Sequence, residues 1–114
     1  MRHQKVNRKF GRKRGQRKAL IRSLARSLVL VGKIETTEEK AKELRPFVEK
    51  LVTKAKVNSL AAKRTIASRL HPDTVKKMME LGEKYMNRPG GYTRIVKIWR
   101  RTADGSAHAF IEFV

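Results

Sequence analysis

The sequence predicts an α+β fold: four helices packed on a small, mostly antiparallel sheet with a C-terminal hairpin, plus a basic N-terminal extension. Apolar residues recur at three- and four-residue steps as far as Met86, and after Gly90 the pattern becomes that of strands. The first 34 residues contain no acidic side chain. We therefore divide the chain into a basic N-terminal extension, residues 1–15, and a single α+β domain, residues 16–114.

The first predicted helix spans about Gln16 to Val31 and ends at Gly32, a residue type that favours helix termination. Lys18, Arg22 and Arg26 recur every four residues and form a basic stripe apart from the apolar one. The apolar stripe consists of Leu20, Ile21, Leu24, Leu28 and Val31.

A short extended segment, Lys33–Thr36, follows and can add a strand to the sheet. The second helix then runs to about Lys56. Thr36 with Glu39 fits a capping box, and Thr37 is a competing cap. The residues expected to be buried on this helix are Ala41, Leu44, Val48, Leu51, Val52 and Ala55.

Two further helices are separated by His71-Pro72-Asp73, which interrupts the helical pattern. One spans about Ser59 to Leu70, and the other about Asp73 to Met86. The apolar residues of the former are Leu60, Ile66, Ala67 and Leu70. Those of the latter are Val75, Met78, Met79, Gly82, Tyr85 and Met86.

The chain ends in a predicted β-hairpin, Thr93–Arg101 and Ala107–Val114, joined by the turn signal Asp104-Gly105. Both faces of the last strand are partly apolar, so the sequence does not decide which face packs on the helices. One face has Ala109, Ile111 and Phe113, and the other has His108, Phe110 and Glu112.

The charge distribution indicates a polyanionic partner. The chain has 29 basic and 10 acidic residues, and twelve of the basic ones lie within the acid-free first 34. Such crowding of like charge costs free energy through self-repulsion unless an anion neutralises it. Met1–Lys18 has only Val6 and Phe10 as large apolar residues beyond Met1, so it lacks the means to fold alone.

Other classes fit less well. The absence of cysteine excludes disulfides and thiolate metal sites, and no apolar run approaches the ~20 residues that span a bilayer. Arg22 and Arg26 interrupt the apolar stretch Ala19–Val31, unlike a secretory signal core. A mitochondrial transit peptide would be Arg-rich and acid-free like this start, but the segment is needed for the core.

Catalytic patterns are missing from the sequence. His3, His71 and His108 are far apart, and none belongs to an HExxH pair. Gly90-Gly91 lacks the spacing of a phosphate-binding loop. We therefore expect no enzyme, no catalytic or metal site, no cofactor and no small-molecule substrate.

Recognition of RNA through shape and backbone is the better expectation, because aromatic residues are few and scattered in the sequence. Arginine can donate two hydrogen bonds to one phosphate, and the hairpin offers a second cationic surface. The residues predicted to bind RNA are Arg2, His3, Lys5, Arg8, Lys9, Arg12, Lys13, Arg14, Arg17, Lys18, Arg22, Arg94, Lys97, Arg100 and Arg101.

Several blocks resemble a known family over essentially the whole chain. They are Met1-Arg2-His3, Gly11-Arg12-Lys13, Arg17-Lys18-Ala19-Leu20, Ser27-Leu28, Ile34-Glu35-Thr36-Thr37, Lys40-Ala41-Lys42-Glu43-Leu44-Arg45 and Arg88-Pro89-Gly90-Gly91-Tyr92-Thr93-Arg94-Ile95. Their order and spacing resemble the bacterial large-subunit ribosomal protein of family seventeen. Trp99 departs from the family pattern, which leads us to expect a smaller or polar residue there.

That resemblance implies a structural constituent of the large ribosomal subunit, cytoplasmic and within the ribosome. Its expected partners are large-subunit ribosomal RNA and neighbouring large-subunit proteins near the tunnel exit, with no membrane. A nucleoid-type DNA-binding protein remains the alternative that charge alone permits, although no recognition-helix signature supports it. A membrane-active cationic helix, Gln16–Val31, is a third class, but it leaves the later elements without a purpose.

Overall fold

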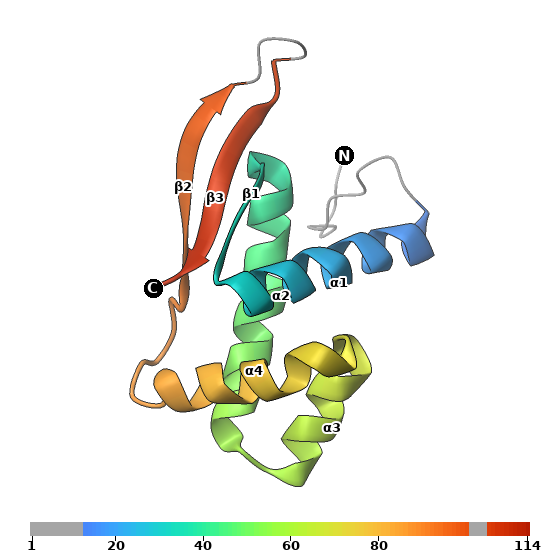
Figure 1. The fold of residues 1–114 in the computed structure, drawn as a ribbon, viewed down its shortest axis with the longest axis vertical. Coiled ribbons are helices and arrows are strands. Elements are labelled where there is room, and N and C mark those ends of the chain that lie inside the picture. The colour runs from blue at the N-terminus through green and yellow to red at the C-terminus, as the bar shows by residue number, and fades with distance from the viewer. Residues whose placement is uncertain (1–12, 101–104) are drawn as a thin grey trace, which may run out of the picture.

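The structure, a computed structural model, describes residues 13–99, the backbone of Arg100, and residues 105–114. These residues form four helices and one antiparallel sheet, which confirms the predicted α+β class (Figure 1). The elements are α1 (Arg14–Val31), β1 (Lys33–Thr37), α2 (Glu38–Val57), α3 (Leu60–Arg69), α4 (Pro72–Lys84), β2 (Thr93–Arg100) and β3 (Ala107–Phe113).

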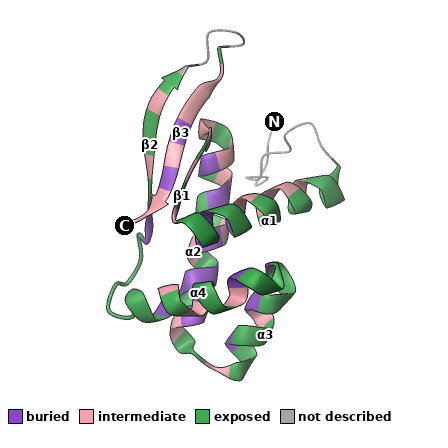
Figure 2. Ribbon diagram, in the orientation of Figure 1, coloured by how far each residue is buried: buried purple, intermediate pink, exposed green. Residues whose placement is uncertain are grey.

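Helix α2 is the centre of the fold and contacts all six other elements (Figure 1). Its N-terminal cap is Thr37, whose hydroxyl accepts a hydrogen bond from the Lys40 backbone amide at 3.3 Å, so the competing cap is the correct one. Thr36 lies in β1 opposite Ala109. Figure 2 shows buried positions along the whole of α2. All six residues predicted as its core are buried: Ala41, Leu44, Val48, Leu51, Val52 and Ala55.

Helix α1 begins at Arg14, two residues before the predicted start. It ends at Gly32, whose φ of 93° is left-handed and whose amide donates to the Leu28 carbonyl at 2.7 Å, as expected of a glycine cap. The prediction that Val31 faces the core is wrong, because Val31 is 73% exposed. In the last turn the buried residues are instead Leu28 and Val29.

The helix pair α3–α4 covers the far end of α2. The predictions that Leu60, Ala67 and Met86 face the core are wrong, because all three are exposed, whereas Ile66 and Leu70 are buried as expected. Glycine is required on α4, since a Cβ on Gly82 would lie 2.6 Å from the Ala55 backbone carbon. The close contact lets α4 lie directly on α2.

The sheet has the order β1–β3–β2, with β3 in the middle and both neighbours antiparallel to it. The residues that pack on the helical core are Ala109, Ile111 and Phe113, which decides the face that the sequence left open. His108 and Phe110 therefore lie on the opposite face, the outer face of the sheet. An irregularity between Lys97 and Trp99 shifts the register of β2.

Candidate nucleic-acid interface

The start of α1 presents exposed cations that were predicted to bind RNA. Lys13, Arg14, Lys18 and Arg22, which we call the basic start of α1, are exposed, and this part of the helix projects beyond the other described elements (Figures 1 and 2). None of the four forms an ion pair within the described residues. Arg17 is half-buried and has a partner, so it differs from them. Four uncompensated charges on one projecting helix favour contact with phosphate.

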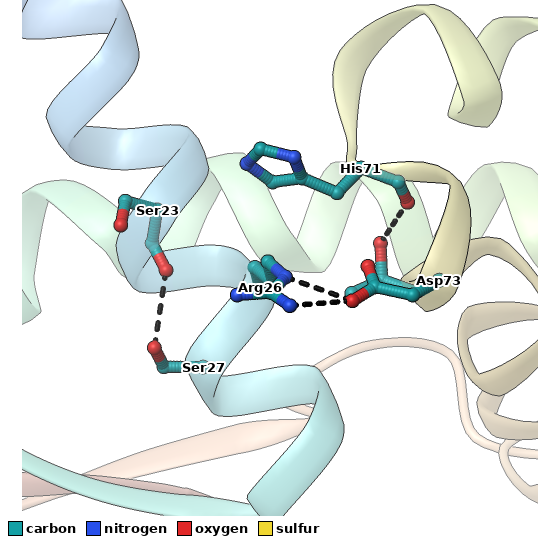
Figure 3. Close-up of polar contacts among 6 residues, drawn as sticks. Ser23, Arg26, Ser27, His71 and Asp73 are labelled. Carbon is teal, nitrogen blue, oxygen red and sulfur yellow. Dashed lines mark hydrogen bonds and ion pairs between the residues drawn. The ribbon is translucent and has the colours of Figure 1, made fainter.

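Arg26 continues the basic stripe in sequence but has another role. Its Nε and Nη2 donate to the same Asp73 Oδ2 at 2.9 and 2.7 Å, joining α1 to the first turn of α4 (Figure 3). The hydrogen bond from the Arg26 guanidinium holds the pKa of Asp73 below its usual range and raises that of Arg26. Arg26 is thus engaged within the protein.

The predicted cations of the sheet, Arg94 and Lys97, are also exposed but face carboxylates. Arg94 Nε lies 2.6 Å from Glu112 Oε1, and Lys97 Nζ lies 3.4 Å from Glu38 Oε1. The hydrogen bond from Arg94 lowers the pKa of Glu112. Hydrogen bonds from Lys42, which has the larger effect, and from Lys97 lower the pKa of Glu38. Their charges are partly neutralised before any partner binds.

Several predicted RNA-binding residues lie outside the described part of the chain. For Arg100 only the backbone is described. The residues outside the described ranges are Arg2, His3, Lys5, Arg8, Lys9, Arg12 and Arg101.

A second group of cations, not among the predicted RNA-binding residues, lies on α2 and α3. They are exposed and make no ion pair within residues 13–99 and 105–114; we call them the α2–α3 cations: Lys50, Lys54, Lys63, Arg64 and Arg69. The signal was present in the sequence, because no acidic residue lies between Glu49 and Asp73. This acid-free stretch is a weaker signal than the N-terminal one, which is longer and denser in basic residues.

The block Arg88–Ile95, prominent in the family resemblance, is anchored by polar contacts with α2. Lys56 Nζ donates to the buried Tyr92 hydroxyl at 3.0 Å, and this hydrogen bond lowers the tyrosine pKa. Glu49 Oε2 accepts from the Thr93 amide at 3.1 Å and from its hydroxyl at 3.2 Å. These contacts therefore hold the segment that connects α4 to β2 against α2.

The described residues form neither a metal site nor a membrane-spanning helix. They contain no group of three histidine, cysteine or carboxylate side chains that could hold a metal ion. Within the same ranges, no helix has the length and apolarity to cross a membrane.

The sequence comparisons agree with one another. The family described as Ribosomal protein L17 matches residues 20–114. A relative from Gemmatimonas aurantiaca, named Large ribosomal subunit protein bL17, is 52% identical over 116 residues, covering all of this chain and 98% of its own. The chain belongs to the ribosomal protein L17 family.

Other L17 relatives extend this match. Proteins of the same name from Sulfurihydrogenibium sp. (strain YO3AOP1) and Rickettsia bellii (strain OSU 85-389) are 50% and 49% identical across the full chain. The chain covers 97% and 82% of their respective lengths. The predicted family is therefore confirmed. L17 proteins are structural and non-enzymatic, which also confirms the prediction that the chain is not an enzyme.

Proposed function

We propose that the chain is a structural constituent of the large ribosomal subunit in the bacterial cytoplasm, where it binds large-subunit ribosomal RNA. Membership of the L17 family supports the ribosomal assignment. The observation that carries RNA binding is the basic start of α1, whose four exposed cations have no carboxylate partner within the described residues. In a chain of net charge +19 they favour a polyanion.

The proposed mechanism is neutralisation and cross-linking of RNA segments. Residues 1–15 extend the basic start of α1 with further arginine and lysine and without any acid. Guanidinium groups donate paired hydrogen bonds to phosphate, so the extension and α1 would hold RNA backbones that otherwise repel each other. The α2–α3 cations add a second surface. From the family resemblance, we also propose that the chain lies near the tunnel exit and contacts neighbouring large-subunit proteins there.

Sedimentation of a tagged full-length chain from bacterial lysate tests this proposal. On a sucrose gradient we expect the chain to move with the large subunit, and to shift to the top after ribonuclease treatment. Co-purification with genomic DNA that survives ribonuclease would instead favour the nucleoid-type alternative. A chain that stays at the top without ribonuclease would contradict both ribosomal incorporation and RNA binding.

A further inference from the structure

The outer face of the sheet gathers ring side chains from the two strands of the C-terminal hairpin. Trp99 on β2 lies opposite His108 on β3, and their rings stack with centroids 4.9 Å apart and planes 3° from parallel. Phe110 follows on the same face opposite Val96, and Lys33 Nζ lies 4.2 Å from the centre of the Phe110 ring. Antiparallel register therefore produces an aromatic surface that the spacing of these residues does not suggest.

One face of the Trp99 indole is open. His108 covers the other face, yet Trp99 is still 50% exposed, whereas the His108 side chain is only 13% exposed. The two rings border a shallow depression of about 310 Å³, which is also lined by Glu38, Lys97, Ile98 and Ala107.

The charges near this surface do not favour a phosphate site. Lys97 is paired with Glu38, and Arg94 with Glu112. A phosphate would have to compete with those carboxylates, whereas an uncharged ring would not. An aromatic face instead offers dispersion and quadrupole interactions with another planar group.

We propose that an unpaired nucleobase of the bound RNA stacks on the open face of Trp99 and extends the Trp99–His108 stack to three rings; this rests on the proposed RNA binding. The net charge of +19 makes an anionic polymer the partner that is drawn to this surface. Among the parts of such a polymer, the base is both flat and uncharged. Stacking of this kind tolerates any base identity, because every base has a π-face.

The sole tryptophan of the chain gives a direct signal for this contact. We would titrate the full-length protein with deproteinised large-subunit ribosomal RNA, following tryptophan fluorescence and, independently, filter binding. We expect quenching of Trp99 fluorescence and a loss of affinity of about ten-fold in Trp99→Ala, within the range measured for base–aromatic stacking. The matched control is Met86→Ala on an equally exposed apolar residue (48%), which should bind like wild type.

Ring-retaining and ring-deleting variants separate stacking from a general apolar contact. Trp99→Phe should retain most of the affinity and Trp99→Leu should not, while circular dichroism melts verify that all variants are folded. Wild-type binding by Trp99→Leu would overturn the proposal. So would wild-type RNA affinity without quenching, an outcome that leaves RNA binding itself intact. Quenching only in assembled subunits would assign the contact to a neighbouring protein and also overturn it. No RNA binding by either method would refute the proposed function together with this inference.

Discussion

The basic start of α1 and the cations of the sheet are similarly exposed but differ in their neighbours. Lys18 and Arg22 have no carboxylate partner among the described residues, whereas Arg94 and Lys97 each contact a glutamate. An exposed cation paired with an acid must give up that contact, or share it, before it can bind phosphate. Local acid content, and not exposure, therefore decides which cations are available to RNA.

Arg26 shows the same rule within a single helix. It lies four residues after Arg22, but Asp73, 47 residues away in the sequence, comes close to it because α4 packs beside α1. Lys18 and Arg22 thus make no ion pair among the described residues, whereas Arg26, one turn later, joins α1 to α4.

The largest expected effect comes from removing the unpaired charges. Replacing Lys13, Arg14, Lys18 and Arg22 together by Gln should lower affinity for large-subunit RNA by about 100-fold or more and flatten the salt dependence, since each lost phosphate contact removes about 0.7–0.9 from the log–log slope. Filter binding at several salt concentrations measures both quantities.

The matched control for that variant is Lys33, Arg94 and Lys97 replaced by Gln. These three all lie near sheet or α2 glutamates, at 4.0, 2.6 and 3.4 Å, so we expect a much smaller loss. Equal losses for the two variants, after allowance for one charge, would show that total charge matters and that pairing does not.

The second expected effect concerns the α2–α3 cations. Replacing Lys54, Lys63 and Arg64 by Gln should reduce occupancy in large subunits by several-fold, because each is exposed and unpaired within the described residues. Quantitative mass spectrometry of purified subunits measures the occupancy. Lys42→Gln is the control, since Lys42 lies 2.9 Å from Glu38. Normal incorporation of the triple variant would leave α1 and the extension as the RNA-binding parts.

Much of the fold could be predicted from the regular spacing of apolar residues, because burying one face of a helix requires that spacing. All six residues predicted as the core of the central helix α2 are buried, since every other element contacts this helix. Val31 and Leu60 lie at helix ends, where the neighbouring chain turns away and no partner covers them. The inner face of β3 could not be chosen from the sequence, because Phe110 makes the outer face partly apolar as well.

The candidate site was only partly predictable for a related reason. The absence of acids near α1 is a local property and is visible in the sequence. The contacts Arg26–Asp73 and Arg94–Glu112 join residues 47 and 18 apart, so they depend on the fold. The Trp99–His108 stack depends on strand register and on the irregularity after Lys97.

A smaller effect, in the opposite direction, is expected from removing a sheet carboxylate. Glu112→Gln releases Arg94 and Lys33 for phosphate and should raise RNA affinity by about two- to five-fold, as one or two extra contacts are gained. Glu80→Gln is the control, because it removes the same charge from an exposed α4 carboxylate that makes no ion pair among the described residues. An equal gain in both variants would attribute the effect to net charge.

The smallest expected effect is the pH dependence of stability that these ion pairs cause. Arg94 lowers the pKa of Glu112 below its ordinary value of 4.5, so the folded state holds the charged carboxylate more strongly than the unfolded state does. The resulting stabilisation is fully present above the unfolded pKa and is lost as pH falls through the folded one. Thermal melts should therefore show a slightly lower Tm for Glu112→Gln than for wild type at about pH 6, and a smaller difference at about pH 3. Glu80→Gln, at an exposed α4 carboxylate without an ion pair in the described ranges, should match wild type at both values. A difference for Glu112→Gln that is undiminished at the lower pH would mean that the side chain stabilises the sheet by packing. Ion pairing would then not be what distinguishes the sheet cations from those of α1.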